Sequence, residues 1–146
     1  MMVLPWLSPI AAQAQCAEGT TTGRLTERVK QVERTWVDMD VERVRTAGDD
    51  LAQALSCVDE PLSPELVARV HRAFGLTRVV DADLDGAARS FWAARYADPE
   101  LGMSDALAPP GTPVRLLYEK PSPYVENVVL ERPRRGSLLI DGVTSQ

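Results

Sequence analysis

A short acidic run supplies the first residues that could bind a ligand. Residues 81–86, DADLDG, place three aspartates at alternate positions before a glycine. These residue types open a twelve-residue calcium-binding loop, which also needs a bidentate carboxylate at its twelfth position. Trp92 occupies that position and has no oxygen to offer. Because residues 87–97 have the composition of a continuous helix, we interpret the aspartates as side chains at a helix N-terminus, where exposed amides favour negative charge. We predict no metal site here.

Residues able to catalyse a reaction are few. The single histidine, His71, lies between Arg69 and Arg72 in a predicted helix, where we expect a structural role. The acidic pair Asp49 and Asp50 also lies within a predicted helix, and adjacent helical side chains point about 100° apart. The chain contains no nucleophile elbow, HExxH motif, phosphate loop or dinucleotide-binding fingerprint. We therefore predict that the protein is not an enzyme and uses no cofactor.

The N-terminal residues indicate export. Residues 1–14 are uncharged and largely apolar, are too short to span a bilayer, and end in a small–x–small pattern typical of a signal peptide. We expect the mature chain to begin at Gln15 in the periplasm or at the cell surface. Oxidising conditions there favour a disulfide between Cys16 and Cys57, which would stabilise the fold by roughly 4 kcal/mol. A pair of inert thiols and a lipid anchor at Cys16 are the alternatives.

The composition is that of an ordinary folded domain. Apolar residues make up 45% and charged residues 25% of the 146 residues, and the net charge is −5. An acidic chain lacks the basic surface that binds phosphate groups, so we predict that nucleic acid is not a partner. The basic cluster of Arg132, Arg134 and Arg135 is more typical of a polar turn.

Apolar residues recur at helical spacing through most of the chain. They predict helices over residues 24–37, 41–57, 64–79 and 84–97, with charged residues such as Glu33 on the outer surface. Trp36 and Trp92 lie on the apolar faces and are predicted core residues. Short links between the helices imply two consecutive antiparallel hairpins. The expected fold class is mainly α.

The last predicted helix resembles the rear helix of a tetratricopeptide repeat. Small, aromatic, small and proline residues stand at the spacings of that family, at Ala87, Phe91, Ala94 and Pro99. Phe74 and Gly75 fall where the front helix of the repeat carries a large apolar and a small residue. The resemblance implies that small residues let the two helices approach closely while the aromatic ring fills the space beyond them.

This resemblance covers residues 64–99. His71 and Arg78 stand where the family often has tryptophan and tyrosine, and the hairpin at 24–57 does not reproduce the motif. We interpret residues 15–120 as a degenerate helical-repeat-like domain, with a plain bundle of four or five helices as the alternative.

The residues after Pro99 predict a cap and then strands. Thr112 and Pro113 can start a helix whose apolar side chains, Val114, Leu117 and Tyr118, would cover the open end of the last hairpin. Residues 121–146 predict a β-hairpin, with strands at 124–131 and 137–140 joined by a turn at 132–136 and a further turn signal at 141–142. This hairpin is typical of the start of a truncated β module.

These features favour a binding role. We expect an exported helical-repeat-like protein-interaction module of the bacterial cell envelope, with an unidentified protein or peptide partner and with membrane association only through a downstream segment. The alternative is a structural N-terminal head or spacer of a larger membrane-associated or surface protein.

Overall fold

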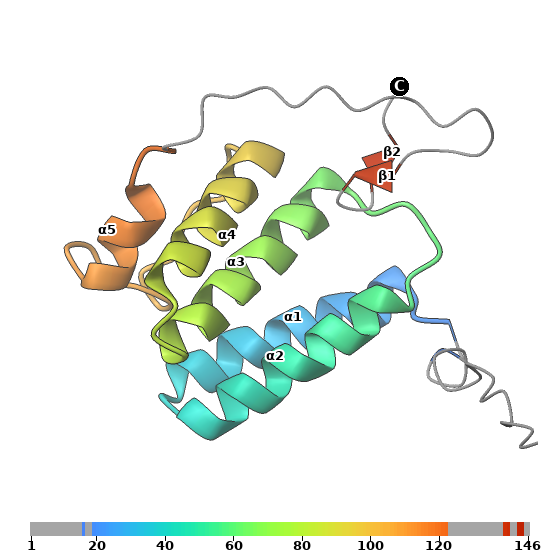
Figure 1. The fold of residues 1–146 in the computed structure, drawn as a ribbon, viewed down its shortest axis with the longest axis horizontal. Coiled ribbons are helices and arrows are strands. Elements are labelled where there is room, and N and C mark those ends of the chain that lie inside the picture. The colour runs from blue at the N-terminus through green and yellow to red at the C-terminus, as the bar shows by residue number, and fades with distance from the viewer. Residues whose placement is uncertain (1–15, 17–18, 123–138, 141–142, 145–146) are drawn as a thin grey trace, which may run out of the picture.

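The fold consists of two helical hairpins and a short terminal helix. The computed structural model describes Cys16 and residues 19–122, 139–140 and 143–144. Within this part of the chain there are five helices: α1 (Thr22–Val37), α2 (Val41–Ser56), α3 (Pro64–Val80), α4 (Leu84–Ala97) and α5 (Pro113–Glu119). Helix α3 packs against α1 and α2 on one side and α4 on the other (Figure 1). The prediction of a mainly helical fold is confirmed.

Each helix begins with a side chain that caps it. The capping oxygen accepts a hydrogen bond from the amide three residues later, which satisfies one of the free N–H groups of the first turn. The capping residues are Thr21, Asp40, Ser63, Asp83 and Thr112. Proline follows the cap at the start of α3 and α5, where its missing N–H costs nothing.

The two hairpins have similar backbone structures. Equivalent residues lie 43 positions apart in the sequence, so that Asp83 in the second hairpin corresponds to Asp40 in the first. In both turns the aspartate amide donates to a carbonyl five residues earlier, from Asp40 to Thr35 at 3.2 Å and from Asp83 to Arg78 at 2.9 Å. The preceding residue has a positive φ in each case, as at left-handed helix C-termini. Both turns lie at the same end of the molecule, at the left of Figure 1.

Burial follows the same offset. Val44, Ala47, Gly48 and Leu51 of α2 are buried, and 43 residues later so are the corresponding residues of α4, Ala87, Ser90, Phe91 and Ala94. The hairpins are therefore repeats in geometry and burial, although their residue types differ. The offset is longer than the 34 residues of a tetratricopeptide repeat.

Two glycines let neighbouring helices approach closely. A Cβ at Gly75 of α3 would lie 2.1 Å from a ring carbon of Phe91, and a Cβ at Gly48 of α2 would lie 2.5 Å from the Cγ2 of Thr77. Both distances are far below the 3.5–4.0 Å at which carbon atoms pack. Gly75 thus sets the spacing within the second hairpin, and Gly48 sets the spacing between the two hairpins.

Helix α5 covers the exposed side of α4. Tyr118 is 4% exposed, its ring meets the ring of Phe91 edge-on at 5.5 Å, and its hydroxyl donates to the carbonyl of Leu101. Val114 and Leu117 are partly buried against the same apolar cluster. The prediction that these side chains cover the open end of the last hairpin is confirmed.

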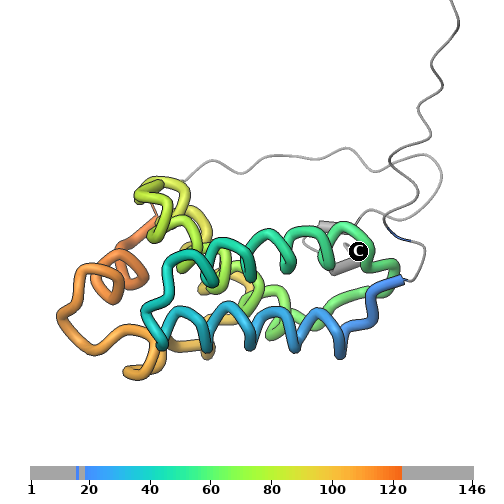
Figure 2. The backbone as a smooth tube through the Cα atoms, turned by 90° about the horizontal axis from the view of Figure 1, so that it is seen from below, coloured from blue at the N-terminus to red at the C-terminus, as the bar shows by residue number. Residues whose placement is uncertain are grey.

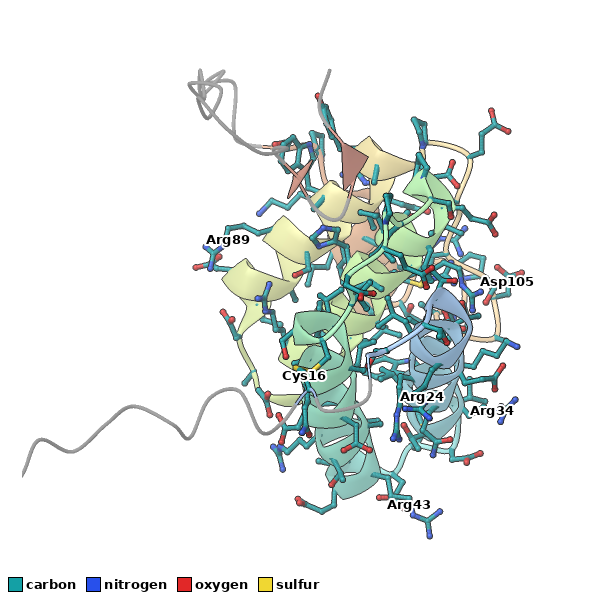
Figure 3. All side chains as sticks on the ribbon, turned by 90° about the vertical axis from the view of Figure 1, so that its right-hand side faces the viewer. Cys16, Arg24, Arg34, Arg43, Arg89 and Asp105 are labelled. Carbon is teal, nitrogen blue, oxygen red and sulfur yellow. A yellow bond between two sulfur atoms is a disulfide. The ribbon has the colours of Figure 1, made fainter. Side chains whose placement is uncertain are left out.

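The start of the helical region is fastened to the end of the first hairpin. Cys16 is bonded to Cys57, with their Cα atoms 5.3 Å apart, which is the predicted pairing. The amide of Thr20 donates to the carbonyl of Cys57 at 3.1 Å, and the amide of Thr22 donates to Glu60 at 2.5 Å. Figure 3 shows Cys16 beside α2.

A largely buried charged cluster lies between α1, α3 and the segment after α4. Arg72 is 7% exposed and donates to Glu33 and to the carbonyl of Gly102, both at 2.7 Å. Arg69 donates to the other carboxylate oxygen of Glu33 at 3.2 Å. The expectation that Glu33 lies on the outer surface is wrong, because α3 packs over it and supplies two arginines.

Near the C-terminus two short strands, β1 (Leu139–Ile140) and β2 (Val143–Thr144), pair antiparallel, with Leu139 opposite Thr144. The predicted strand at 124–131 and turn at 132–136 lie outside the described residues, as do residues 1–14. No helix that the structure describes is both long and apolar enough to cross a membrane.

Candidate functional site

The three aspartates of residues 81–86 serve three separate purposes. Asp81 accepts a hydrogen bond from Arg45 of α2 at 2.8 Å, and Asp83 caps α4 through the amide of Gly86 at 2.9 Å. Asp85 is exposed in the first turn of α4. Among the described residues, no group of three histidine, cysteine or acidic side chains is arranged to hold a metal ion.

The predicted packing residues divide between two interfaces. Gly75, Ala87, Phe91 and Ala94 are all buried, and Gly75 lies directly against the ring of Phe91. Phe74 is only partly buried and packs against the other apolar cluster, between α1, α2 and α3. Pro99 is exposed just beyond α4.

A groove of about 490 Å³ lies at the end of the molecule that carries the hairpin turns. Its walls come from the α1–α2 turn, the end of α3 and the segment that leads into α5, which lies beside that turn in Figure 2. The lining residues are Trp36, Val37, Met39, Val41, Val44, Val79, Val80, Ala106, Leu107, Ala108, Pro109, Thr112 and Val114. Twelve of these thirteen are apolar, and the volume is typical of binding sites for small ligands or side chains of a partner.

Trp36 joins two walls of this groove. Its indole N–H donates to the carbonyl of Leu107 at 2.6 Å, which ties the end of α1 to the segment before α5. Trp36 is partly buried and packs against the edge of the second apolar cluster, so its predicted place in the core is only partly confirmed. Thr35 is buried at this end of α1 instead. The indole is left as part of the groove wall with its hydrogen-bond donor already used.

Arg115 of α5 holds in place the groove wall formed by the segment that leads into α5. Its guanidinium donates to the carbonyls of Met103 at 2.5 Å and Ala108 at 3.3 Å, and it pairs with Glu119 at 2.6 Å. The hydrogen bond to Glu119 raises the pKa of Arg115. The groove therefore has walls that are fixed by hydrogen bonds.

The mouth of the groove exposes three apolar side chains close together in the sequence. Val37 is 50%, Met39 89% and Val41 47% exposed within one turn. Contiguous exposed apolar residues of this kind often mark interaction sites. Met39 also has φ 57°, a left-handed conformation that costs an ordinary residue about 1 kcal/mol and that glycine or asparagine adopts more readily.

The charged residues around the mouth are mostly paired. Arg45 pairs with Glu42 and with Asp81, both at 2.8 Å, and the hydrogen bond to Asp81 raises the pKa of Arg45. Arg43 pairs with Asp40 at 3.2 Å and extends away from the helices in Figure 3. The pair with Asp81 braces the start of α2 against the end of α3.

A second depression, of about 420 Å³, lies on the outer face of α1 and is lined by charged and amide side chains. Arg28 there pairs with Asp50 at 3.0 Å. Glu27 pairs with Lys30 at 2.6 Å, and that hydrogen bond lowers the pKa of Glu27. Figure 3 shows Arg34 extending from α1 into solvent. This arrangement is that of a solvated helix face.

Residue types alone did not reveal the groove. One available signal was the repeated turn, Val-Asp-x-Asp, at 37–40 and 80–83, with an exposed methionine at the x position of the first copy only. No protein-family model, curated protein or solved structure matches this chain.

Proposed function

We propose that the protein is a binding module whose apolar groove holds a segment of a partner protein. The observation that carries this proposal is the groove itself. Three separate stretches of chain are braced by hydrogen bonds around a space that is lined by apolar side chains and one threonine, Thr112. The lining residues include no histidine, cysteine or acidic side chain, and the one hydroxyl, that of Thr112, donates to the carbonyl of Pro109 at 2.8 Å, so the arrangement supports binding rather than catalysis.

The fixed walls support this function physically. A preformed site does not have to be ordered when the partner binds, so less of the interaction energy is lost. A groove of this size buries a few side chains of a partner, which suits a short segment better than a large flat surface.

We also propose that the module acts outside the cytoplasm. The disulfide between Cys16 and Cys57 supports this, because disulfides persist in oxidising compartments. The uncharged apolar residues 1–14 add the expectation of a signal peptide. The cell envelope is therefore where a partner should be sought.

Site-specific photocrosslinking in intact cells tests the proposal. A photoreactive amino acid at position 39, in the mouth of the groove, should give a discrete crosslinked product that mass spectrometry identifies. Tyr96 is the matched control, because it is 78% exposed and lies on α4 away from the groove, whereas Met39 is 89% exposed. Products of the same pattern from both positions, or none from position 39, would show that the groove does not hold a protein.

A further inference from the structure

In a step that rests on the function proposed above, we propose that the groove selects a partner segment in which lysines or arginines flank the apolar side chains. The groove itself carries no charge, so any preference between partner segments of equal apolar content must come from the residues at its mouth. Charged side chains at a rim mainly determine which partners are accepted and how fast they associate.

The rim has an excess of negative charge. We take as the rim the charged residues that adjoin a lining residue in the sequence: Asp38, Asp40, Glu42, Asp81 and Asp105 are acidic, and Arg43, Arg45, Arg78 and Arg115 are basic. Arg78 does not offset them at the rim, because its guanidinium turns toward α4 and donates to the carbonyl of Gly86 and to Ser90. Without Arg78 the rim has a formal charge of −2, and the whole chain has −5.

Each of the other basic rim residues is already paired with an acidic neighbour, as described above, whereas Asp38 is exposed at the end of α1. Asp40, Glu42, Asp81 and Asp105 are the acidic partners in such pairs, and Asp38 takes part in none of them. A cationic residue from outside would therefore meet Asp38 and the net negative charge of the rim, whereas an acidic one would meet only guanidinium groups that are already engaged.

A second copy of this chain is a poorer occupant. Two copies joined through their grooves would place two rims of the same sign against each other, between molecules that each carry −5. Like charges brought together in an interface are unfavourable. A basic partner meets no such repulsion.

Met39 supports a partner contact at the same rim, independently of charge. It occupies a left-handed position that glycine would fill with less strain, yet it projects a flexible thioether at the mouth of the groove. In the equivalent turn of the second hairpin, Ala82 has nearly the same φ, 60°, but no long side chain. Methionine is well suited to contact varied apolar side chains, so its strained position fits a contact with the partner.

Two labelled model peptides test the inference with the full-length protein. Both are amphipathic helices of about four turns with leucine on one face; one has lysine and the other glutamate at every remaining position. Fluorescence anisotropy should show the lysine peptide binding about tenfold more tightly at low salt. The difference should shrink toward zero near 1 M salt, where the Debye length is about 3 Å.

Paired variants locate the effect. The double variant D38N/E42Q should remove most of the preference for lysine, whereas D59N/E100Q removes two exposed acids at the other end of the helices and should leave it largely intact. V41Q should weaken both peptides. The control L84Q changes the equivalent exposed residue of the second hairpin, which does not line the groove, and should weaken neither.

The outcomes separate the two proposals. If both peptides bind equally and V41Q weakens both, the inference about basic partners is wrong while the binding groove stands. If neither peptide binds, or V41Q has no more effect than L84Q, the proposed function itself is overturned.

A further variant pair tests Met39. M39G and A82G should both keep or raise the midpoint of urea unfolding, because glycine adopts a positive φ without strain. Only M39G should also weaken the lysine peptide, by about fivefold. Equal peptide affinities of M39G and the unaltered protein would show that Met39 does not contact the partner.

Discussion

The close contact between the hairpins makes a sharp prediction about Gly48. Replacing Gly48 with alanine places a Cβ 2.5 Å from the Cγ2 methyl of Thr77, which is buried on α3. Since carbon atoms pack at about 3.5–4.0 Å, α2 and α3 would have to separate by about 1 Å. Replacing Thr77 with serine removes that methyl and keeps the hydroxyl, which donates to the carbonyl of Phe74 at 2.9 Å.

The magnitudes follow from these contacts. Overpacking of this kind costs about 1–3 kcal/mol, and alanine gains about 0.5–1 kcal/mol over glycine inside a helix. We expect G48A to lower the free energy of unfolding by about 1–2 kcal/mol and T77S to lower it by about 0.8 kcal/mol, the value of one buried methyl group. The double variant G48A/T77S should lie within about 0.5 kcal/mol of the unaltered protein, because the alanine methyl fills the space that serine leaves.

Urea unfolding followed by far-ultraviolet circular dichroism measures this double-mutant cycle. Gly75 provides the control, since it lies on α3 but contacts Phe91 instead. G75A should be destabilised by the ring, and T77S should not rescue it. If the losses of G48A and T77S simply add in the double variant, the hairpins do not meet at Gly48 and Thr77, and the packing described between them is incorrect.

Three further predictions concern stability. Burial raises the pKa of Tyr118, so above about pH 10 the unfolded chain loses a proton that the folded protein keeps, and the free energy of unfolding falls as pH rises. In urea titrations at alkaline pH, Y118F should reduce that fall, whereas Y96F, at an exposed ring, should not. The double variant C16S/C57S should lose about 4 kcal/mol of unfolding free energy, and adding a reductant to the unaltered protein should cause the same loss; no change would mean that the bond does not form. E33Q leaves two largely buried arginines without a carboxylate and should cost about 3 kcal/mol, measured by thermal unfolding; a loss below 1 kcal/mol would contradict the buried cluster.

Local features of the chain were sufficient to predict the helices. Apolar residues at helical spacing, together with capping residues such as Asp40 and Ser63, mark where helices begin. The fourth helix was predicted at the residues it occupies, Leu84–Ala97. Capping and periodicity depend only on residues within a few positions of each other, so they can be recognised without knowledge of the fold.

Predictions that depended on distant neighbours were less successful. Trp36 continues the apolar face of α1, but its ring is only partly covered and lines the groove. The segment that it contacts, residues 106–108, comes some seventy positions later in the chain. Glu33 looked like a surface residue, and only the approach of α3 with Arg69 and Arg72 buries it. In each case the side chain's environment is supplied by a part of the chain that periodicity does not identify.

The sequence by itself determined that this chain forms capped amphipathic helices arranged as hairpins. It also contains only two cysteines, so Cys57 is the one residue with which Cys16 can form a disulfide within the chain. Only the tertiary structure decided that the two hairpins stack at an offset of 43 residues and leave an apolar groove where their turns meet the segment before α5. The physical reason is the range of the forces involved. Helix formation follows from interactions over three or four residues, whereas a groove exists only after separate helices have fixed their spacing, here through Gly48 and Gly75.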